Sequence, residues 1–273
     1  MAAGNITSTR GLEGLQQKAL LSMERAAFHK SFSSPGPVVL PVIHVLDTEQ
    51  TVRNIEIAIE EKAHGVFLIN HDFEKERLVP IIREVRQRFA SLWLGVNFLA
   101  VTGRDAFPVL GQLEQDGCRV DAYWGDDARI DESRGADDQA EAEEIARVRM
   151  DSGWGGIYFG GTAFKKQREV DAADFEISAR LAVPFMDVVT TSGKATGKEA
   201  DIDKIAAFRR GIGVAPLAIA SGITPENAQN YADADCFMVA TGINWDDDFY
   251  NIEPARLVRL MDVASDLGGH KDD

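Results

Sequence analysis

Two short apolar runs near the C-terminal end of the chain each stop at a hydroxyl residue followed by glycine. The first run ends in Ser221-Gly222, and the second, about 20 residues later, ends in Thr241-Gly242. A buried strand of a parallel sheet has such an apolar run, and a terminal glycine lets another group approach the backbone closely. The last two strands of an eight-stranded α/β barrel commonly end at a phosphate site. We therefore predict that Ser221, Gly222, Thr241 and Gly242 bind a phosphate group.

A helix is predicted to begin directly after the first of these strand ends. Thr224 is a good N-cap residue, and Pro225 suits the first helical turn. The free N–H groups and the dipole of a helix N-terminus favour anions. We expect this helix N-terminus to lie at the phosphate site.

A polar stretch over 190–198 offers more substrate contacts. It contains hydroxyl residues, two glycines and two lysines, and no apolar side chain larger than alanine. Backbone N–H groups and hydroxyls suit an oxyanion, and a flexible loop can close over a ligand. The spacing is not that of a Walker P-loop. We predict that Thr190, Ser192, Gly193 and Thr196 bind the substrate, with a plain exposed loop as the alternative.

Three ionisable side chains are candidates for catalysis: Asp187, His44 and Lys165. Asp187 lies within a predicted apolar strand, and if its face of the strand is the barrel interior, it is a buried carboxylate that needs a partner. His44 ends an apolar run and is either a general base or ligand, or a satisfied core histidine. Lys165 follows a Gly-Gly pair and is a phosphate cation, a Schiff-base amine or a solvated surface residue. We expect Asp187 and His44 to supply acid–base chemistry and Lys165 to assist electrostatically.

Other polar residues near predicted strand ends are candidates for supporting roles. Asn97 and Asp121 either orient a sugar hydroxyl or fill polar layers inside the barrel. The segment after the predicted fourth strand carries nine acidic residues against two arginines, which is typical of a solvated loop and helix face. The alternative is a divalent-cation site, for Mg²⁺, formed by Asp126, Asp127 or Asp131 with a substrate phosphate.

Strand and helix patterns alternate through most of the chain. Eight strand-like runs recur at intervals of 20 to 37 residues, and helical patterns separate most of them. This alternation predicts a parallel sheet, and eight strands close a (β/α)8 TIM barrel. An open doubly wound sheet is the alternative, which the lack of a dinucleotide fingerprint after the first strand disfavours. The predicted strands are 38–45, 65–70, 93–99, 118–124, 156–161, 184–190, and the runs before Ser221 and Thr241.

The segment 1–36 is predicted to form a helical extension and linker ahead of a barrel domain over 37–273. Apolar residues recur at helical spacing over 11–30, and the Ser, Pro and Gly residues over 31–37 indicate a linker. The helix either plugs the bottom of the barrel or packs on a neighbouring copy, and we expect a homo-oligomer.

Composition limits the classes of partner. The formal net charge of −15 argues against nucleic acid or an anionic membrane as a general partner, but not against a phosphorylated small molecule. No run approaches the roughly 18 apolar residues of a membrane span, and the N-terminal segment lacks a signal-peptide pattern. Cys118 and Cys236 are isolated and are expected to be free thiols. We therefore expect a cytoplasmic protein with no integral membrane segment.

The sequence resembles the BtpA family, (β/α)8-barrel proteins that include a photosystem I biogenesis factor and the SgcQ-type proteins. The resemblance is clearest in the motifs DVVTTSGKATG at 187–197, ASGITPEN at 220–227 and VATGI at 239–243. The Ser-Gly and Thr-Gly strand ends are also similar to those of phosphoribosylanthranilate isomerase and other phosphate-binding barrels. The resemblance implies the barrel fold and a phosphate site, but no particular reaction.

Two functions follow from these predictions. The first is a phosphate-binding TIM-barrel enzyme that acts on a phosphorylated small molecule, of the sugar or ribosyl phosphate class, as an isomerase, lyase or phosphoribosyl transferase. The second is a non-catalytic assembly or biogenesis factor that uses the barrel as a scaffold. Barrels carry many reactions, so the fold by itself does not choose between them.

Overall fold

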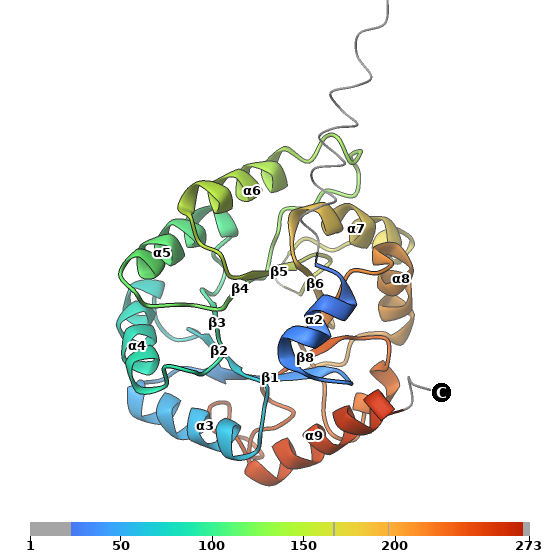
Figure 1. Ribbon diagram of the computed structural model, residues 1–273. Coiled ribbons are helices and arrows are strands. Elements are labelled where there is room, and N and C mark those ends of the chain that lie inside the picture. The colour runs from blue at the N-terminus through green and yellow to red at the C-terminus, as the bar shows by residue number, and fades with distance from the viewer. Residues whose placement is uncertain (1–22, 166, 196, 270–273) are drawn as a thin grey trace, which may run out of the picture.

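Eight parallel strands form a closed barrel in which spatial neighbours follow the order of the chain. The computed structural model describes residues 23–165, 167–195 and 197–269. The predicted (β/α)8 TIM barrel is confirmed (Figure 1). The strands are β1 (Val38–His44), β2 (Val66–Ile69), β3 (Leu94–Asn97), β4 (Ala122–Gly125), β5 (Ile157–Gly161), β6 (Val188–Thr191), β7 (Leu217–Ile219) and β8 (Cys236–Val239).

Helices surround the barrel as an outer ring (Figure 1). Aspartates begin two of them: Asp47 accepts the N–H of Gln50 at the start of α3, and Asp201 accepts that of Asp203 at the start of α8. Within the described residues, no helix is long and apolar enough to cross a membrane. The helices are α2 (Arg25–Phe32), α3 (Thr48–Glu60), α4 (Lys75–Arg88), α5 (Gly103–Gln115), α6 (Ala140–Ser152), α7 (Phe175–Ala182), α8 (Ile202–Ile212) and α9 (Pro254–Gly269), with the short 3₁₀ helices η1 (Ala172–Asp174), η2 (Val183–Phe185) and η3 (Ala228–Tyr231).

The α-helix predicted to begin at Thr224 is not found in this described stretch, where a turn leads into η3. Asn227 accounts for the difference. Its Oδ1 accepts the N–H of Thr224 at 2.8 Å, and its Nδ2 donates to the carbonyl of Gly222 at 2.7 Å. These bonds hold the backbone in a turn and compete with helical hydrogen bonds. The prediction that a helix N-terminus lies at the phosphate site is therefore wrong.

Alternate strand residues build two separate apolar layers. Inward-pointing residues fill the barrel interior, and outward-pointing residues pack against the surrounding helices. In β1, Leu40 and Val42 belong to the interior layer, so His44, two residues further on, also points inward. Phe67 fits the interior because its partner in β3, Gly95, has no side chain, and a Cβ there would lie 2.3 Å from the Phe67 ring.

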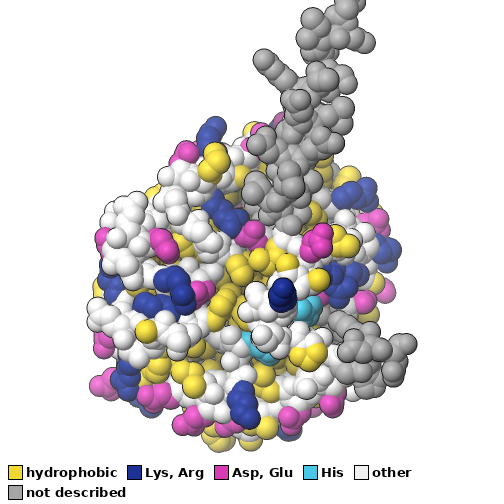
Figure 2. Space-filling view, in the orientation of Figure 1, with side chains coloured by type: hydrophobic (Ala, Val, Ile, Leu, Met, Phe, Trp, Pro, Cys, Tyr) yellow, Lys and Arg dark blue, Asp and Glu magenta, His cyan; other side chains and the backbone are white. Residues whose placement is uncertain are grey.

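Helix α2 lies across the N-terminal end of the barrel (Figure 1), and charged side chains of both signs surround this face (Figure 2). Phe28 is fully buried in the interior layer. Arg25 Nε and His29 Nε2 contact Asp235 Oδ1 at 2.7 and 2.9 Å, directly before β8. Of the two predicted positions of the N-terminal helix, the structure shows the one that plugs the barrel. The part of the predicted helix over 11–22 lies outside the described residues.

A repeated arrangement of aspartate and arginine closes the same end of the barrel. Asp235 accepts the N–H of Leu217 in β7 at 2.9 Å and contacts Arg209 of α8 at 2.6 Å. An aspartate placed in this way therefore joins two neighbouring strands to one helix. The same arrangement precedes β4, as Asp121 with Leu94 and Arg86, and β6, as Asp187 with Tyr158 and Arg149.

Asp235 is fully buried, which by itself would raise the pKa of its carboxyl group. The hydrogen bonds from His29 and Leu217 and the charges of Arg209 and Arg25 outweigh burial and hold the pKa well below its ordinary value. The carboxylate therefore stabilises the fold above about pH 4, and this contribution is lost on further acidification.

Removing this carboxylate should leave Arg209 buried without its charge partner. We expect Asp235→Ala to lower the free energy of unfolding by about 3–5 kcal/mol, measured by urea unfolding at pH 7. Asp151→Ala, on the exposed face of α6, is the control and should change it by less than about 0.5 kcal/mol. A loss below about 1 kcal/mol for Asp235→Ala would show that the barrel base does not depend on this pair.

Candidate functional site

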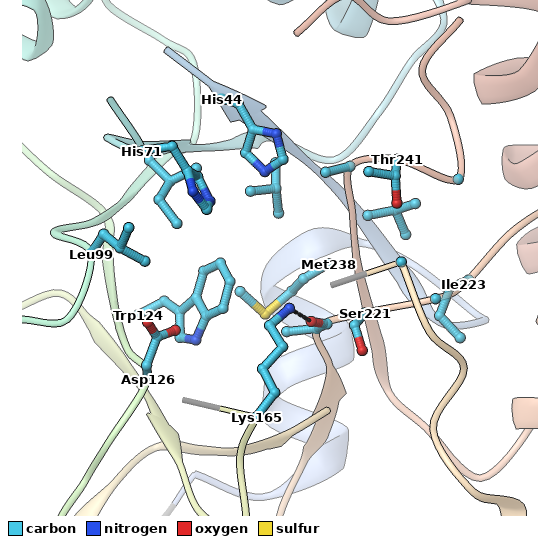
Figure 3. A pocket seen from close by; sticks show the side chains of 18 residues that line it. His44, His71, Leu99, Trp124, Asp126, Lys165, Ser221, Ile223, Met238 and Thr241 are labelled. Carbon is cyan, nitrogen blue, oxygen red and sulfur yellow. Dashed lines mark hydrogen bonds between the residues drawn. The ribbon is translucent and has the colours of Figure 1, made fainter. Parts of the chain in front are cut away.

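A pocket opens at the C-terminal end of the barrel, opposite α2 (Figure 3). The space inside it and at its mouth, open solvent included, is about 510 Å³, but the cavity itself measures about 40 Å³, below the roughly 300–1,000 Å³ of small-molecule sites. The side chains of His44, Trp124 and Lys165 point into it from different strand ends (Figure 3). The polar and charged residues of the lining are His44, His71, Asp126, Lys165, Ser221 and Thr241.

His44 is oriented by the loop between β8 and α9. Its Nδ1 lies 2.8 Å from the carbonyl of Phe249, and because a carbonyl only accepts, Nδ1 carries the hydrogen and Nε2 the lone pair. Burial lowers the pKa of His44 to about 4; the charges of His71 and Lys165 act in the same direction, while the Phe249 bond and Asp72 oppose it. His44 is therefore neutral at pH 7, and its Nε2 can accept a proton from a bound molecule.

The loop that orients His44 is tied to α3. The carbonyl of Tyr250 accepts Nε2 of Gln50 at 2.7 Å and Nδ2 of Asn54 at 2.8 Å. The Phe249 ring stacks on His44 with a centroid distance of 3.8 Å. Sequence analysis missed this support because Gln50 and Tyr250 are 200 positions apart, and no local pattern connects them.

Lys165 enters the pocket from the loop after β5. Its Nζ donates to the carbonyl of Ala220, just beyond β7, at 3.2 Å, and its N–H donates to Ser192 Oγ at 2.9 Å. The ammonium therefore has a fixed place at the end of the barrel, close to the Ser221-Gly222 strand end that was predicted to hold phosphate.

A buried lysine that sequence analysis did not single out holds the loop of Lys165. Lys204 Nζ donates to the carbonyls of Ala163 and Ser192 at 2.5 and 2.8 Å, and so joins the loops after β5 and β6. Burial lowers the pKa of Lys204 to about 8, against the charge of Asp201, which raises it. A lysine in an amphipathic helix gives no sequence signal, and only its burial marks it out.

Gly222 and Gly242 lie where neighbouring backbone leaves no space for a side chain. A Cβ on Gly222 would lie 2.4 Å from the Lys198 carbonyl oxygen, and one on Gly242 would lie 1.9 Å from that of Ile223. Gly222 also has φ +68°, in the left-handed region that favours glycine. The N–H groups of Gly222, Ile223, Thr241 and Gly242 donate to none of the described residues. This wall of the pocket therefore offers backbone donors to an anion.

Six of the predicted site residues meet in the pocket, and they come from both ends of the chain. Their individual roles stay predictions. Trp124 and His71 also line the pocket, although sequence analysis did not propose either as a site residue. The six residues are His44, Lys165, Ser221, Gly222, Thr241 and Gly242.

Asp187 and Asp121 lie at the opposite end of the barrel, so their predicted place at the site is wrong. Each stands before its strand and contacts an arginine on the outer ring, Arg149 or Arg86. The predicted strands began four residues before the observed β6 and β4. Val188, the first residue of β6, points inward, so Asp187 belongs to the outward face by alternation.

Four further predicted residues are buried without lining the pocket: Thr190, Ser192, Gly193 and Asn97. Three of them support residues that do. Ser192 Oγ accepts the N–H of Lys165 at 2.9 Å. Gly193 N–H donates to Ser221 Oγ at 2.9 Å, and Asn97 Nδ2 donates to Asp126 Oδ1 at 3.3 Å. Thr196 lies outside the described residues.

The acidic segment after β4 is engaged largely with arginines. Asp127 contacts Arg129 at 3.2 Å, and Asp131 contacts Arg134 at 3.2 Å. In the part of the chain that the structure describes, no group of three His, Cys, Asp or Glu residues is arranged to hold a metal ion. Asp127 and Asp131 are thus each paired with an arginine, and the divalent-cation site stays a prediction.

Comparison with known sequences gives one informative relative. An uncharacterized protein of Thermococcus kodakarensis is 29% identical over 198 residues, which cover 70% of this chain and 71% of that protein. No protein-family profile matches the chain. The resemblance to the BtpA family therefore stays a prediction.

Comparison with solved structures shows the barrel fold. The tryptophan synthase alpha subunit of Legionella pneumophila has a TM-score of 0.60 and 15% identity, covering 90% of this chain and 100% of that chain. The N-(5'-phosphoribosyl)anthranilate isomerase of Pyrococcus furiosus has a TM-score of 0.57 and 13% identity, covering 84% and 99%. At these identities the likeness concerns the fold alone.

Protonation of His44 should make the fold sensitive to acid. Its pKa is about 4 in the folded chain and about 6.5 unfolded, so its stabilising contribution is complete above pH 6.5 and is lost as the pH falls toward 4. Between pH 7 and 4, we expect the wild type to lose up to about 3 kcal/mol more unfolding free energy than His44→Phe, which cannot titrate. Urea unfolding across this range measures the difference, and parallel losses in both proteins would contradict the burial of a neutral imidazole.

Proposed function

We propose that this protein is an enzyme that binds a phosphorylated small molecule in the C-terminal pocket and acts on it by proton transfer. The observation that carries the proposal is the meeting, in one pocket, of a neutral His44, the Lys165 ammonium and the backbone donors around Gly222 and Gly242. A phosphate group is the ligand that such N–H groups and a point cation suit.

The phosphate end of the pocket is supported by local charge. The chain as a whole is acidic, so an anion is drawn only by local donors, and Lys165 supplies a positive charge beside the end of β7. The name of one solved barrel of this fold, N-(5'-phosphoribosyl)anthranilate isomerase, refers to a phosphoribosyl compound. The predicted BtpA resemblance implies a phosphate site as well.

The chemistry follows from where the two ionisable groups lie. His44 ends β1 and Lys165 follows β5, and in a closed barrel of eight strands β1 and β5 stand on opposite sides. The Lys165 side chain reaches the Ala220 carbonyl beyond β7, so its ammonium lies beside the proposed phosphate end of a bound substrate, and the Nε2 base lies toward β1. The ammonium stabilises negative charge that develops as the proton leaves. Isomerase and lyase reactions use such a pair directly, and a phosphoribosyl transferase remains the third prediction.

Inorganic phosphate tests the binding site without knowledge of the substrate. At about 100 times its Kd, phosphate should add about 2.7 kcal/mol of stability, which raises the melting temperature by about 5 °C for a domain of this size. Gly242→Ala should abolish this increase because a Cβ meets the Ile223 carbonyl. Gly155→Ala is the matched control, because a Cβ there meets nothing within 4 Å.

The increase in melting temperature is measured for each protein against its own value without phosphate. A variant that is only less stable is therefore not mistaken for one that has lost phosphate binding. No stabilisation of the wild type by phosphate or by phosphorylated sugars would overturn the proposal and favour the non-catalytic scaffold.

Solvent deuterium tests the proton transfer. A base that removes a carbon-bound proton exchanges it with solvent, so pentose and hexose phosphates incubated in D₂O with the wild type should gain deuterium, measured by mass spectrometry. We expect His44→Gln to slow incorporation by about 100-fold or more. His64→Gln, at the far end of the barrel where His64 contacts Val39, should not. Incorporation that persists in His44→Gln would remove His44 from the mechanism.

A further inference from the structure

Two side chains at the end of β4 face the pocket from the side opposite the backbone donors. Trp124 and Asp126 both line the pocket (Figure 3). They are two residues apart, and Ala122 and Trp124 belong to the interior layer, so all three share the inward face. In the closed barrel, β4 stands across from β8. A ligand whose phosphate lies at Gly242 therefore extends its other end toward Trp124.

The indole N–H of Trp124 is a hydrogen-bond donor that the described residues leave without an acceptor. The side chain is 4% exposed, and within the described part of the chain no acceptor pairs with its Nε1. Trp154 is also 4% exposed, but its Nε1 donates to the carbonyl of Val120 at 3.0 Å. Buried indole N–H groups ordinarily have a partner. The N–H of Trp124 is thus a donor that a ligand oxygen can satisfy.

Asp126 determines which ligand groups fit beside this donor. Its Oδ1 accepts Nδ2 of the fully buried Asn97 at 3.3 Å, which fixes the carboxyl plane. The oxygens of a carboxylate accept hydrogen bonds from a ligand. An amine could donate to Asp126 but not accept from Trp124, whereas hydroxyl groups do both.

We infer that Trp124 and Asp126 form hydrogen bonds with hydroxyl groups at the end of the substrate remote from its phosphate. The two residues would thereby select a polyhydroxylated phosphate ester. This inference rests on the proposed function, because it takes the phosphate end from it. Trp124 is the specificity-determining donor, Asp126 the acceptor, and Asn97 a positioning residue that acts through Asp126. The substrate then lies along the line from β8 to β4, with His44 beside its middle and the Lys165 ammonium nearer its phosphate end.

Two ligands of equal chain length test the inference. Ribitol 5-phosphate and n-pentyl phosphate both carry one phosphate on five carbons, but only the first has hydroxyl groups. Calorimetric titration of the wild type should show ribitol 5-phosphate bound at least about tenfold more tightly. Trp124→Phe keeps an aromatic ring without the N–H and should lose most of this discrimination, while its affinity for inorganic phosphate stays within about twofold.

A stability measurement separates a ligand contact from a structural one. Trp154→Phe leaves the Val120 carbonyl without its donor and should lower the midpoint of urea unfolding. Trp124→Phe removes a donor that has no acceptor among the described residues, so its midpoint should fall by less than that of Trp154→Phe. If Trp124→Phe fails to fold, Asp126→Asn provides the second test, since it replaces the acceptor by a donor and should also reduce the preference for ribitol 5-phosphate.

The outcomes distinguish the two proposals. If the wild type binds inorganic phosphate but binds the two esters with equal affinity, this inference is overturned and the proposed function stands. The same holds if Trp124→Phe and Asp126→Asn both retain the preference for ribitol 5-phosphate. A wild type that binds none of the three phosphates would overturn the proposed function, and this inference with it.

Discussion

The structure depends on three buried or half-buried carboxylates that close the base of the barrel. Asp121, Asp187 and Asp235 each accept a backbone N–H from the preceding strand and an arginine from a surrounding helix. Such a charge has a high desolvation cost unless it is paired, so each aspartate fixes the relative positions of two strands and a helix. The alternation of strand residues then carries this register to the other end. The directions of side chains at the mouth therefore depend on the aspartate–arginine pairs at the base.

The base and the mouth of the barrel therefore have different roles. The base is closed by ion pairs and by α2, whose Phe28 fills the interior. Within the described residues, no comparable network of paired carboxylates surrounds the glycines of the mouth. Gly222 and Gly242 instead allow backbone segments to approach one another closely, and the N–H groups of Gly222, Ile223, Thr241 and Gly242 donate to none of the described residues. The ion pairs thus lie at the base, the end of such barrels whose residues serve stability.

Groups in the pocket are poised by contacts from distant parts of the chain. The Phe249 carbonyl fixes the tautomer of His44, and burial keeps that imidazole neutral. Lys204, itself buried, joins the loops that place Lys165. Proton transfer requires a base in the correct protonation state and in a fixed orientation, and these contacts provide both. In the proposed site, Trp124 and Asp126 bind hydroxyl groups across the barrel from the backbone donors that bind phosphate.

The sequence by itself determined the barrel, because the alternation of strands and helices and the apolar runs are local patterns. It also determined that Ser221, Gly222, Thr241 and Gly242 lie at the mouth, since a glycine that follows a buried strand marks a strand end. The starts of strands could not be predicted from local patterns. The predicted start of β6 was four residues too early, which placed Asp187 on the wrong face of the strand and at the wrong end of the barrel. Only the tertiary structure decided that point, because the arginine partner that holds Asp187 outward comes from a neighbouring helix. For the same reason, side chains whose roles come from burial or from contacts across the barrel, such as Lys204 and Trp124, carried no signal in the sequence.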